Sequence, residues 1–64
     1  MERPDELTLR ILARLADGAT AAEAAVACNV SESTLNRRLL SLRRAWGLEN
    51  NTQVLVRAVR VGLV

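Results

Sequence analysis

The sequence predicts an all-α fold, a single domain of four helices over residues 1–64. Half of the 64 residues are apolar, which is too large a share for a disordered chain and enough for one small core. In two long segments the apolar residues recur at the 3.6-residue spacing of an amphipathic helix. A Gly or an Asn separates each predicted helix from the next, and both residues favour turns.

The first helix is expected over residues 5–16. Asp5 follows Pro4 and can accept hydrogen bonds from the free amides of the first turn. Gly18 ends the helix after Asp17, because glycine tolerates left-handed backbone. The apolar residues of this segment form one buried face: Leu7, Ile11, Leu12 and Leu15.

The second helix, expected over residues 20–28, is short and rich in alanine. Thr20 and Glu23 have the spacing of a capping box. Alanine is the best helix former, and its small side chain lets another helix approach closely. Asn29 tolerates the left-handed conformation and can turn the chain sharply, and Cys28 is expected to be a small core residue.

The third helix is expected over residues 31–46, with Ser31 as its cap and Gly47 after its end. Its apolar stripe consists of Leu35, Leu39, Leu42 and Trp46. The fourth helix is expected over residues 52–62 and is apolar over most of its circumference. Trp46 is the largest side chain expected in the core and should contribute most to stability. The side chains expected to be almost inaccessible to solvent are Leu12, Leu15, Ala25, Val30, Leu35, Leu42 and Trp46.

The side of the third helix opposite the stripe is polar and basic. Between Ser31 and Trp46 there are four Arg and one Glu, a net charge of +3, whereas the whole chain has +2. The positive charge is therefore concentrated on this helix. At about 100° per residue, the polar side collects Ser33, Asn36, Arg37, Leu40, Ser41 and Arg44, and its flanks carry Arg38 and Arg43.

A helix face of this kind fits duplex DNA. The major groove admits an α-helix, and Arg and Asn are the side chains that pair with guanine and adenine edges. Arginines at the flanks can reach phosphates and fix the register. A short helix, a tight turn and a second helix with this face form a helix-turn-helix arrangement. A solvated charged face is the simpler interpretation, but the order of the elements favours double-stranded DNA as the partner.

Other function classes are disfavoured by what the sequence lacks. With no His and one Cys, it can form neither a disulfide framework nor a Cys/His zinc site, and no metal or cofactor is expected. It has no Gly-rich phosphate loop, no paired carboxylates on one helix face and no nucleophile beside a base, so no enzyme is expected. Neither a membrane span nor a signal segment is found, and a cytoplasmic location is expected by default.

Several short motifs are shared with one family. Residues 29–35, NVSESTL, contain a Ser-x-x-Thr-hydrophobic step that is followed by Trp46-Gly47. Residues 15–18, LADG, precede it, and the chain closes on Gly62-Leu63-Val64. In these motifs the sequence resembles the LuxR-type (GerE-like) helix-turn-helix domains of bacterial transcription regulators over essentially its whole length.

The resemblance implies a four-helix domain without a wing, whose third helix enters the major groove and whose fourth helix pairs in a homodimer. By position it assigns base contacts to Asn36, Arg37 and Leu40. It assigns contacts with the DNA backbone to Thr34, Arg38, Arg43 and Arg44. Ser33 and Ser41 lie on the same face and complete the expected DNA-binding set.

Three features depart from the pattern of the family that the chain resembles. Leu40 stands where members often carry Lys or Arg. Asp5 and Thr8 stand where members usually have Thr and Glu at the start of the first helix. Glu49 and Asn51 occupy a turn that is normally basic. Leu40, Glu49 and Asn51 reduce the positive charge that would favour phosphate, and Asp5 places a negative charge at the start of the first helix.

The fourth helix has more apolar surface than a core contact requires. A helix that covers a small core needs a stripe only slightly wider than about 100°, so one edge of the apolar arc is left over. Exposed apolar surface beside a polar rim marks an interface, and a dimer fits two DNA half-sites. Leu55, Val56 and Val59 are the expected dimer contacts. In the alternative, this helix is simply the C-terminal lid of the core.

The favoured interpretation is sequence-specific DNA binding by a bacterial transcription regulator. Two alternatives stay open at this point. One is a domain similar to sigma-factor region 4, which shares the four-helix plan and also contacts RNA polymerase. The other is a helical protein-interaction module with weak DNA affinity, in which Leu40 is an anchor.

Overall fold

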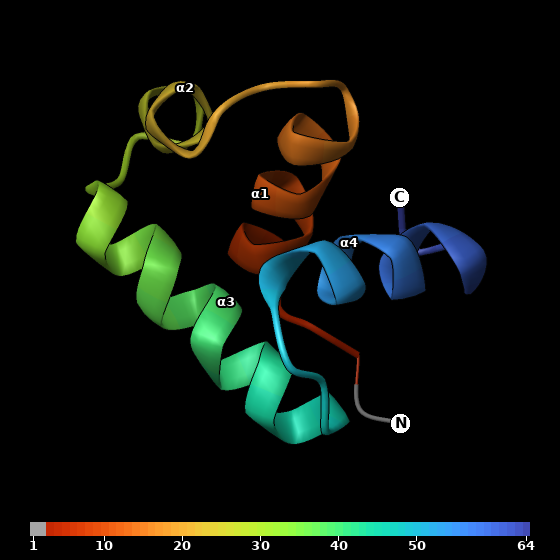
Figure 1. The fold of residues 1–64 in the computed structure, drawn as a ribbon. Coiled ribbons are helices and arrows are strands. Elements are labelled where there is room, and N and C mark those ends of the chain that lie inside the picture. Colours follow the sequence, from red (N-terminus) through yellow and green to blue (C-terminus); the bar gives the residue numbers. More distant parts are fainter. Residues whose placement is uncertain (1–2) are drawn as a thin grey trace.

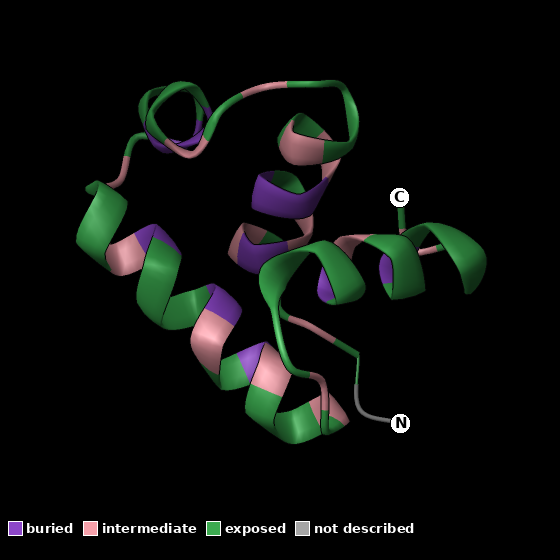
Figure 2. Cartoon of the chain, viewed as in Figure 1, coloured by how far each residue is buried: buried purple, intermediate pink, exposed green. Residues whose placement is uncertain are grey.

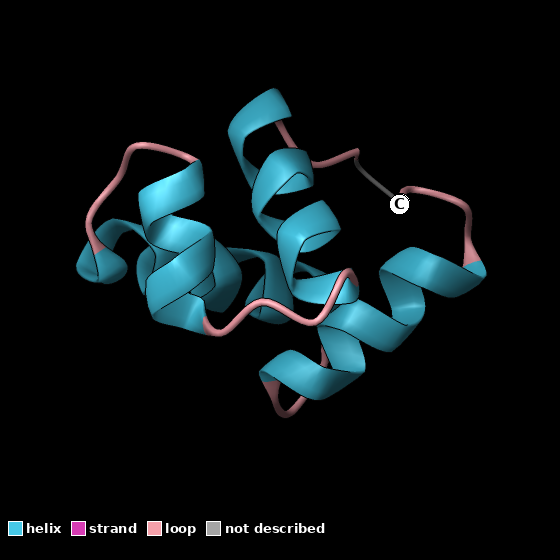
Figure 3. Cartoon of the chain, turned by 90° about the horizontal axis from the view of Figure 1, so that it is seen from above, coloured by secondary structure: helices cyan, strands magenta, loops and turns pink. Residues whose placement is uncertain are grey.

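The computed structural model describes residues 3–64 and shows, within that range, an all-α fold without strands (Figures 1 and 3). The predicted fold class is therefore confirmed. The helices are α1 (Glu6–Ala16), α2 (Ala21–Ala27), α3 (Glu32–Trp46) and α4 (Asn51–Arg60). The first three expected ranges begin one residue earlier because they included the capping residue. Helix α4 ends two residues before its expected end, because Val61 is its C-cap and Gly62 has a left-handed φ of +78°.

Side-chain oxygens cap the start of every helix in the described range. The backbone N–H of Thr8 donates to Asp5 Oδ1 at 2.8 Å. The expected capping box of α2 is present, since the Glu23 N–H donates to Thr20 Oγ1 at 3.1 Å and the Thr20 N–H donates to Glu23 Oε1 at 2.8 Å. These bonds satisfy amides that the helix itself leaves without an acceptor.

Helix α4 begins with a cap that the sequence analysis did not identify. The Gln53 N–H donates to Asn50 Oδ1 at 2.9 Å, and the Glu49 N–H donates to Gln53 Oε1 at 2.6 Å. The two bonds resemble a capping box, except that the Gln53 side chain accepts the N–H of Glu49, one residue before the N-cap residue Asn50. They fix the start of α4 directly after the turn that follows α3.

The turn between α2 and α3 depends on left-handed backbone at Asn29, as predicted, with a φ of +58°. The Val30 N–H then donates to the carbonyl of Ala25 at 3.0 Å, which reverses the chain. Gly47 has the same role after α3, with a φ of +69°. A side chain at this φ would be strained.

The core lies where α1 meets the other helices. Helix α1 packs against α2, α3 and α4, and α3 also packs against α2 and α4. Figure 2 shows the buried positions on the inner sides of the helices. Among the larger side chains, those buried completely are Ile11, Leu12, Leu35 and Val54.

The expected core is partly confirmed. Leu12, Ala25, Leu35 and Leu42 are buried as predicted, and so is Cys28. The prediction is wrong for Leu15, Val30 and Trp46, which are only partly buried and pack against the margin of the core. Leu15 and Trp46 lie in the last turn of a helix and Val30 lies in a loop, so each has fewer neighbours than a residue in mid-helix. The core list also omitted buried residues that include Ala24, Leu39, Val54 and Ala58.

Candidate nucleic-acid interface

Helix α3 runs along one edge of the molecule and packs against α1, α2 and α4 on one side (Figure 1). Its buried side consists of Leu35, Leu39 and Leu42. The opposite side is free and carries exposed polar residues at spacings of four, four and three. We call this surface the reading face; it is formed by Ser33, Arg37, Ser41 and Arg44. It extends over about three helical turns, or about 16 Å.

The start of α3 is held by the cap that joins Ser31 to Thr34. The Thr34 N–H donates to Ser31 Oγ at 3.1 Å, and the Ser31 hydroxyl donates to Thr34 Oγ1 at 3.0 Å. This leaves the hydroxyl hydrogen of Thr34 as the donor available to a phosphate. Thr34 is partly buried and lies beside the reading face.

Asn36 and Arg43 lie on the flank of α3 that is nearer to α4. Asn36 is exposed and lines a shallow depression with residues from the starts of α2 and α4, among them Ala21 and Thr52. Arg43 is partly buried. The structure therefore brings Asn36 to the edge of the reading face, whereas the sequence analysis placed it on the face.

Leu40 is partly buried and lies outside the core cluster. The sequence analysis placed it on the exposed side. Its partial burial reduces the apolar area that a protein partner could use. Leu40 can therefore supply an apolar contact at the edge of the reading face, such as a thymine methyl group requires.

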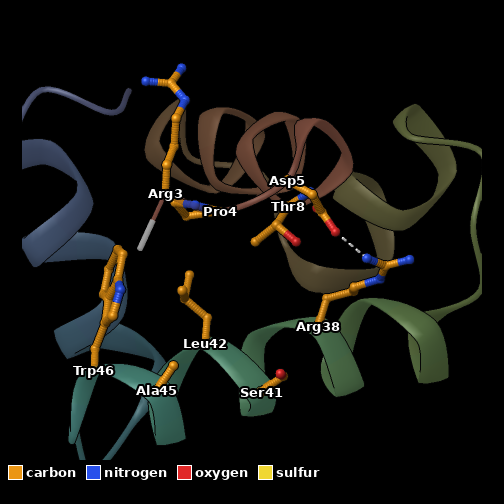
Figure 4. A pocket seen from close by; sticks show the side chains of 9 residues that line it. All are labelled: Arg3, Pro4, Asp5, Thr8, Arg38, Ser41, Leu42, Ala45 and Trp46. Atoms are coloured by element: carbon orange, nitrogen blue, oxygen red, sulfur yellow. Dashed lines mark hydrogen bonds and ion pairs between the residues drawn. The ribbon is translucent and has the colours of Figure 1, made fainter. Parts of the chain in front are cut away.

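Arg38 lies on the other flank of α3 and forms an ion pair with Asp5 (Figure 4). Arg38 Nη1 donates to Asp5 Oδ2, while Asp5 Oδ1 accepts the N–H of Thr8. The Asp5 carboxylate thus caps α1 and contacts α3 at once. Both side chains are about half exposed, Arg38 at 43% and Asp5 at 52%. Sequence reasoning did not find this contact, because it joins residues 33 positions apart.

The same contact lies on the wall of an open pocket of about 310 Å³ between the start of α1 and the flank of α3 (Figure 4). The pocket is also lined by Arg3, Thr8 and Ser41. At its far end Trp46 packs beside Leu42 and Ala45. The Trp46 indole Nε1 is buried and has no hydrogen-bond partner among the described residues. Arg3 lines the pocket from the segment before α1, and its guanidinium points away from α3 (Figure 4).

Hydrogen bonds lower the pKa of two carboxylates at helix starts. The pKa of Asp5 lies below its ordinary value of 3.8, mainly because the backbone N–H of Thr8 stabilises the charged form and also because Arg38 is nearby. The pKa of Glu23 lies below 4.5 because the backbone N–H of Thr20 stabilises its carboxylate. Both groups therefore stabilise the folded protein in their charged form.

Acidification is expected to lower the thermal midpoint. A carboxylate whose pKa is lower in the folded state than in the unfolded state contributes its full stabilisation when the pH is above the unfolded pKa. This stabilisation is lost as the pH falls through the lower, folded pKa. For Asp5 the loss therefore occurs below pH 3.8. Thermal melts between about pH 6 and pH 2.5 measure it. Asp5→Asn, which keeps a capping side chain, should make the profile flatter. An unchanged profile would contradict a stabilising role for this carboxylate.

The described residues contain no cluster of His, Cys, Asp and Glu side chains that could hold a metal ion. Within the same range, no helix is long and apolar enough to cross a membrane. The arrangement of α3 is chemically suited to a polyanion: the free side of α3 offers guanidinium and hydroxyl donors over three turns.

Comparison with known proteins agrees with this geometry. A family model described as a helix-turn-helix domain matches residues 9–50, which include most of α1, all of α2 and α3, and the turn before α4. No curated protein and no solved structure gives a significant match. The family match supports DNA as a partner. Since it covers well over half of the 64 residues, the chain belongs to the helix-turn-helix domain family.

Proposed function

We propose that this chain is the sequence-specific DNA-binding module of a bacterial transcription regulator of the LuxR type. The observation that carries the proposal is the reading face, with two arginines and two serines on the free side of α3. The turn at Asn29 and the cap at Ser31 hold this helix at a fixed angle to α2, as a helix-turn-helix requires. The motifs in residues 29–35 and the closing Gly62-Leu63-Val64 favour the LuxR type.

In this proposal α3 lies in the major groove. The groove is about 12 Å wide, and a helix with its side chains is about 10–12 Å across. Arg37 projects from the centre of the reading face and contacts a base edge. Asn36 and Leu40 make base contacts at its margin. Contacts with the phosphates come from Thr34, Arg43 and Arg44, with Ser33 and Ser41 as further hydrogen-bond donors.

A fluorescence anisotropy titration tests DNA binding. Random duplex should bind at low salt, and the logarithm of the affinity should fall linearly with the logarithm of the salt concentration, because binding releases counterions from the DNA. Selection of bound sequences from a random library should then return one motif with a defined half-site spacing. Random duplex that stays unbound at low salt would overturn the proposal. It would favour a protein-interaction module; among the described residues, the most exposed large apolar side chain is Val26 on α2, at 82%.

We further propose that α4 pairs with α4 of a second copy on DNA. Val56 and Val59 lie on the side of α4 away from the core and are 45% and 52% exposed. Leu55 is partly buried and packs against the core, so it lies at the edge of the proposed contact. A two-fold pair of this kind matches a DNA site with two half-sites about one turn apart. So small a surface should pair weakly in free solution.

Val59→Arg is expected to reduce cooperative binding to a duplex with two half-sites and to leave the thermal midpoint nearly unchanged. The reason is that a charged side chain on this exposed surface disrupts a contact between copies without entering the core. Val61→Arg is the matched control, since Val61, the C-cap residue of α4, is 48% exposed and the substitution adds the same charge. A large drop in the midpoint for Val59→Arg, or equal loss of cooperativity in both variants, would contradict the α4 dimer.

A further inference from the structure

The ion pair between Asp5 and Arg38 places a carboxylate on the flank of the candidate DNA-binding helix. Arg38 is one of four arginines in α3, and a guanidinium at this position would normally be counted among the phosphate contacts. In the structure this guanidinium already has an anionic partner within the chain. The pair is neutral as a unit, so it would release no counterion when it approaches DNA.

We propose that Asp5 is an affinity-determining residue that competes with DNA phosphate for Arg38. The proposal rests on the DNA binding proposed above. It assigns to Asp5 a negative effect on affinity, with no base contact of its own. Asp5 acts through Arg38 and is in this sense a positioning residue.

The two side chains of the Asp5–Arg38 pair differ in how far they can move. The Asp5 carboxylate is held through its other oxygen by the Thr8 N–H at 2.8 Å, so it cannot move away without uncapping α1. Arg38 has a long side chain with several donors, of which one nitrogen contacts Asp5. A phosphate that binds Arg38 must therefore either displace it from Asp5 or approach within a few ångströms of a fixed carboxylate. Both alternatives cost affinity on every DNA sequence.

Asp5→Asn separates the two functions of this side chain. Asparagine caps helices about as well as aspartate, so α1 keeps its start while the negative charge is lost. Freed from its partner, Arg38 should neutralise one further phosphate. The slope of the logarithm of affinity against the logarithm of salt concentration should become steeper by about 0.9. Affinity for random duplex at about 0.1 M salt should rise about tenfold.

Two controls isolate the pair. Asp17→Asn removes the same charge from the other end of α1, where the exposed Asp17 lies beside Arg14 and Glu23. This variant should leave the slope nearly unchanged. Arg38→Gln should change the slope little in the wild-type chain but should lower it by about 0.9 in the Asp5→Asn chain. This non-additivity is the result that a general effect of net charge would not produce.

The outcomes are distinguishable. If the wild-type chain binds DNA and its salt slope equals that of Asp5→Asn, Asp5 does not compete with phosphate for Arg38, and the proposed function still stands. Weaker binding by Asp5→Asn would also overturn it, because Asp5 would then orient Arg38 for DNA. If no variant binds duplex at low salt, the proposed function fails and this inference fails with it. Should Asp5→Asn melt at a much lower temperature, Asp5→Ser repeats the test with another capping residue.

Discussion

Replacing Leu35 by Ala is expected to lower the free energy of unfolding by about 2–5 kcal/mol. Leu35 is fully buried, and it belongs to the same core cluster as Ile11, Leu12 and Val54. The substitution removes apolar contacts and leaves a cavity that the surrounding helices fill only in part. Domains of about 64 residues are stable by about 3–10 kcal/mol. The Leu35→Ala chain should therefore lose a large share of its stability.

Thermal and urea melts followed by circular dichroism measure this loss. Val26→Ala is the matched control, because Val26 is 82% exposed on α2 and its truncation should change the stability by less than about 0.5 kcal/mol. A Leu35→Ala chain with a thermal midpoint within about 2 °C of the wild type would contradict the burial of Leu35 in the core.

Local structure was largely predictable from the sequence, because it depends on residues that are close in the chain. The caps at Asp5, Thr20 and Ser31 each use a side chain and an amide three residues apart. Asn29 has the positive φ that its position between two helices suggested. The cap of α4 was not identified although the Gln53 N–H and Asn50 Oδ1 have the same three-residue spacing, because Asn50, Asn51 and Thr52 are three successive residues of capping type.

The extent of burial was harder to predict. Periodicity identifies the inner side of a helix, but burial also depends on how many elements surround that point. Trp46 was expected to be the main core residue, yet it lies in the last turn of α3 and is only partly buried. The large side chains that are completely buried are instead Ile11, Leu12, Leu35 and Val54. Small residues such as Ala58 are completely buried because they permit the close approach of helices.

The flanks of the candidate site could not be predicted from the sequence alone. The reading face follows from the helical period, and the structure shows its members exposed on the free side of α3. The Asp5–Arg38 pair depends on how α1 crosses α3, which no local pattern encodes. The placement of Asn36 also depends on tertiary packing. Asn36 lies near the margin of the polar side of α3, and the position of α4 decides that it falls at the edge of the reading face.

Arg37→Ala is expected to lower the affinity for the selected DNA sequence by about 1–3 kcal/mol and to relax the preference at one base position. Arg37 is exposed near the centre of the reading face, where a side chain enters the groove first. A guanidinium there can donate two hydrogen bonds to guanine. Binding to random duplex should weaken less, because only the selected site presents that base in register.

Arg43→Ala is the matched comparison, since it removes the same charge from the flank of the same helix. Arg43 is partly buried in the last turn of α3, and in the proposed orientation on DNA it meets a phosphate. Its loss should weaken binding to selected and random duplex alike and should lower the salt slope by about one unit. Titrations of both variants on both duplexes at several salt concentrations measure the difference. If the two variants lose affinity equally on the two duplexes, Arg37 contacts phosphate as Arg43 does, and specificity must come from another part of the reading face.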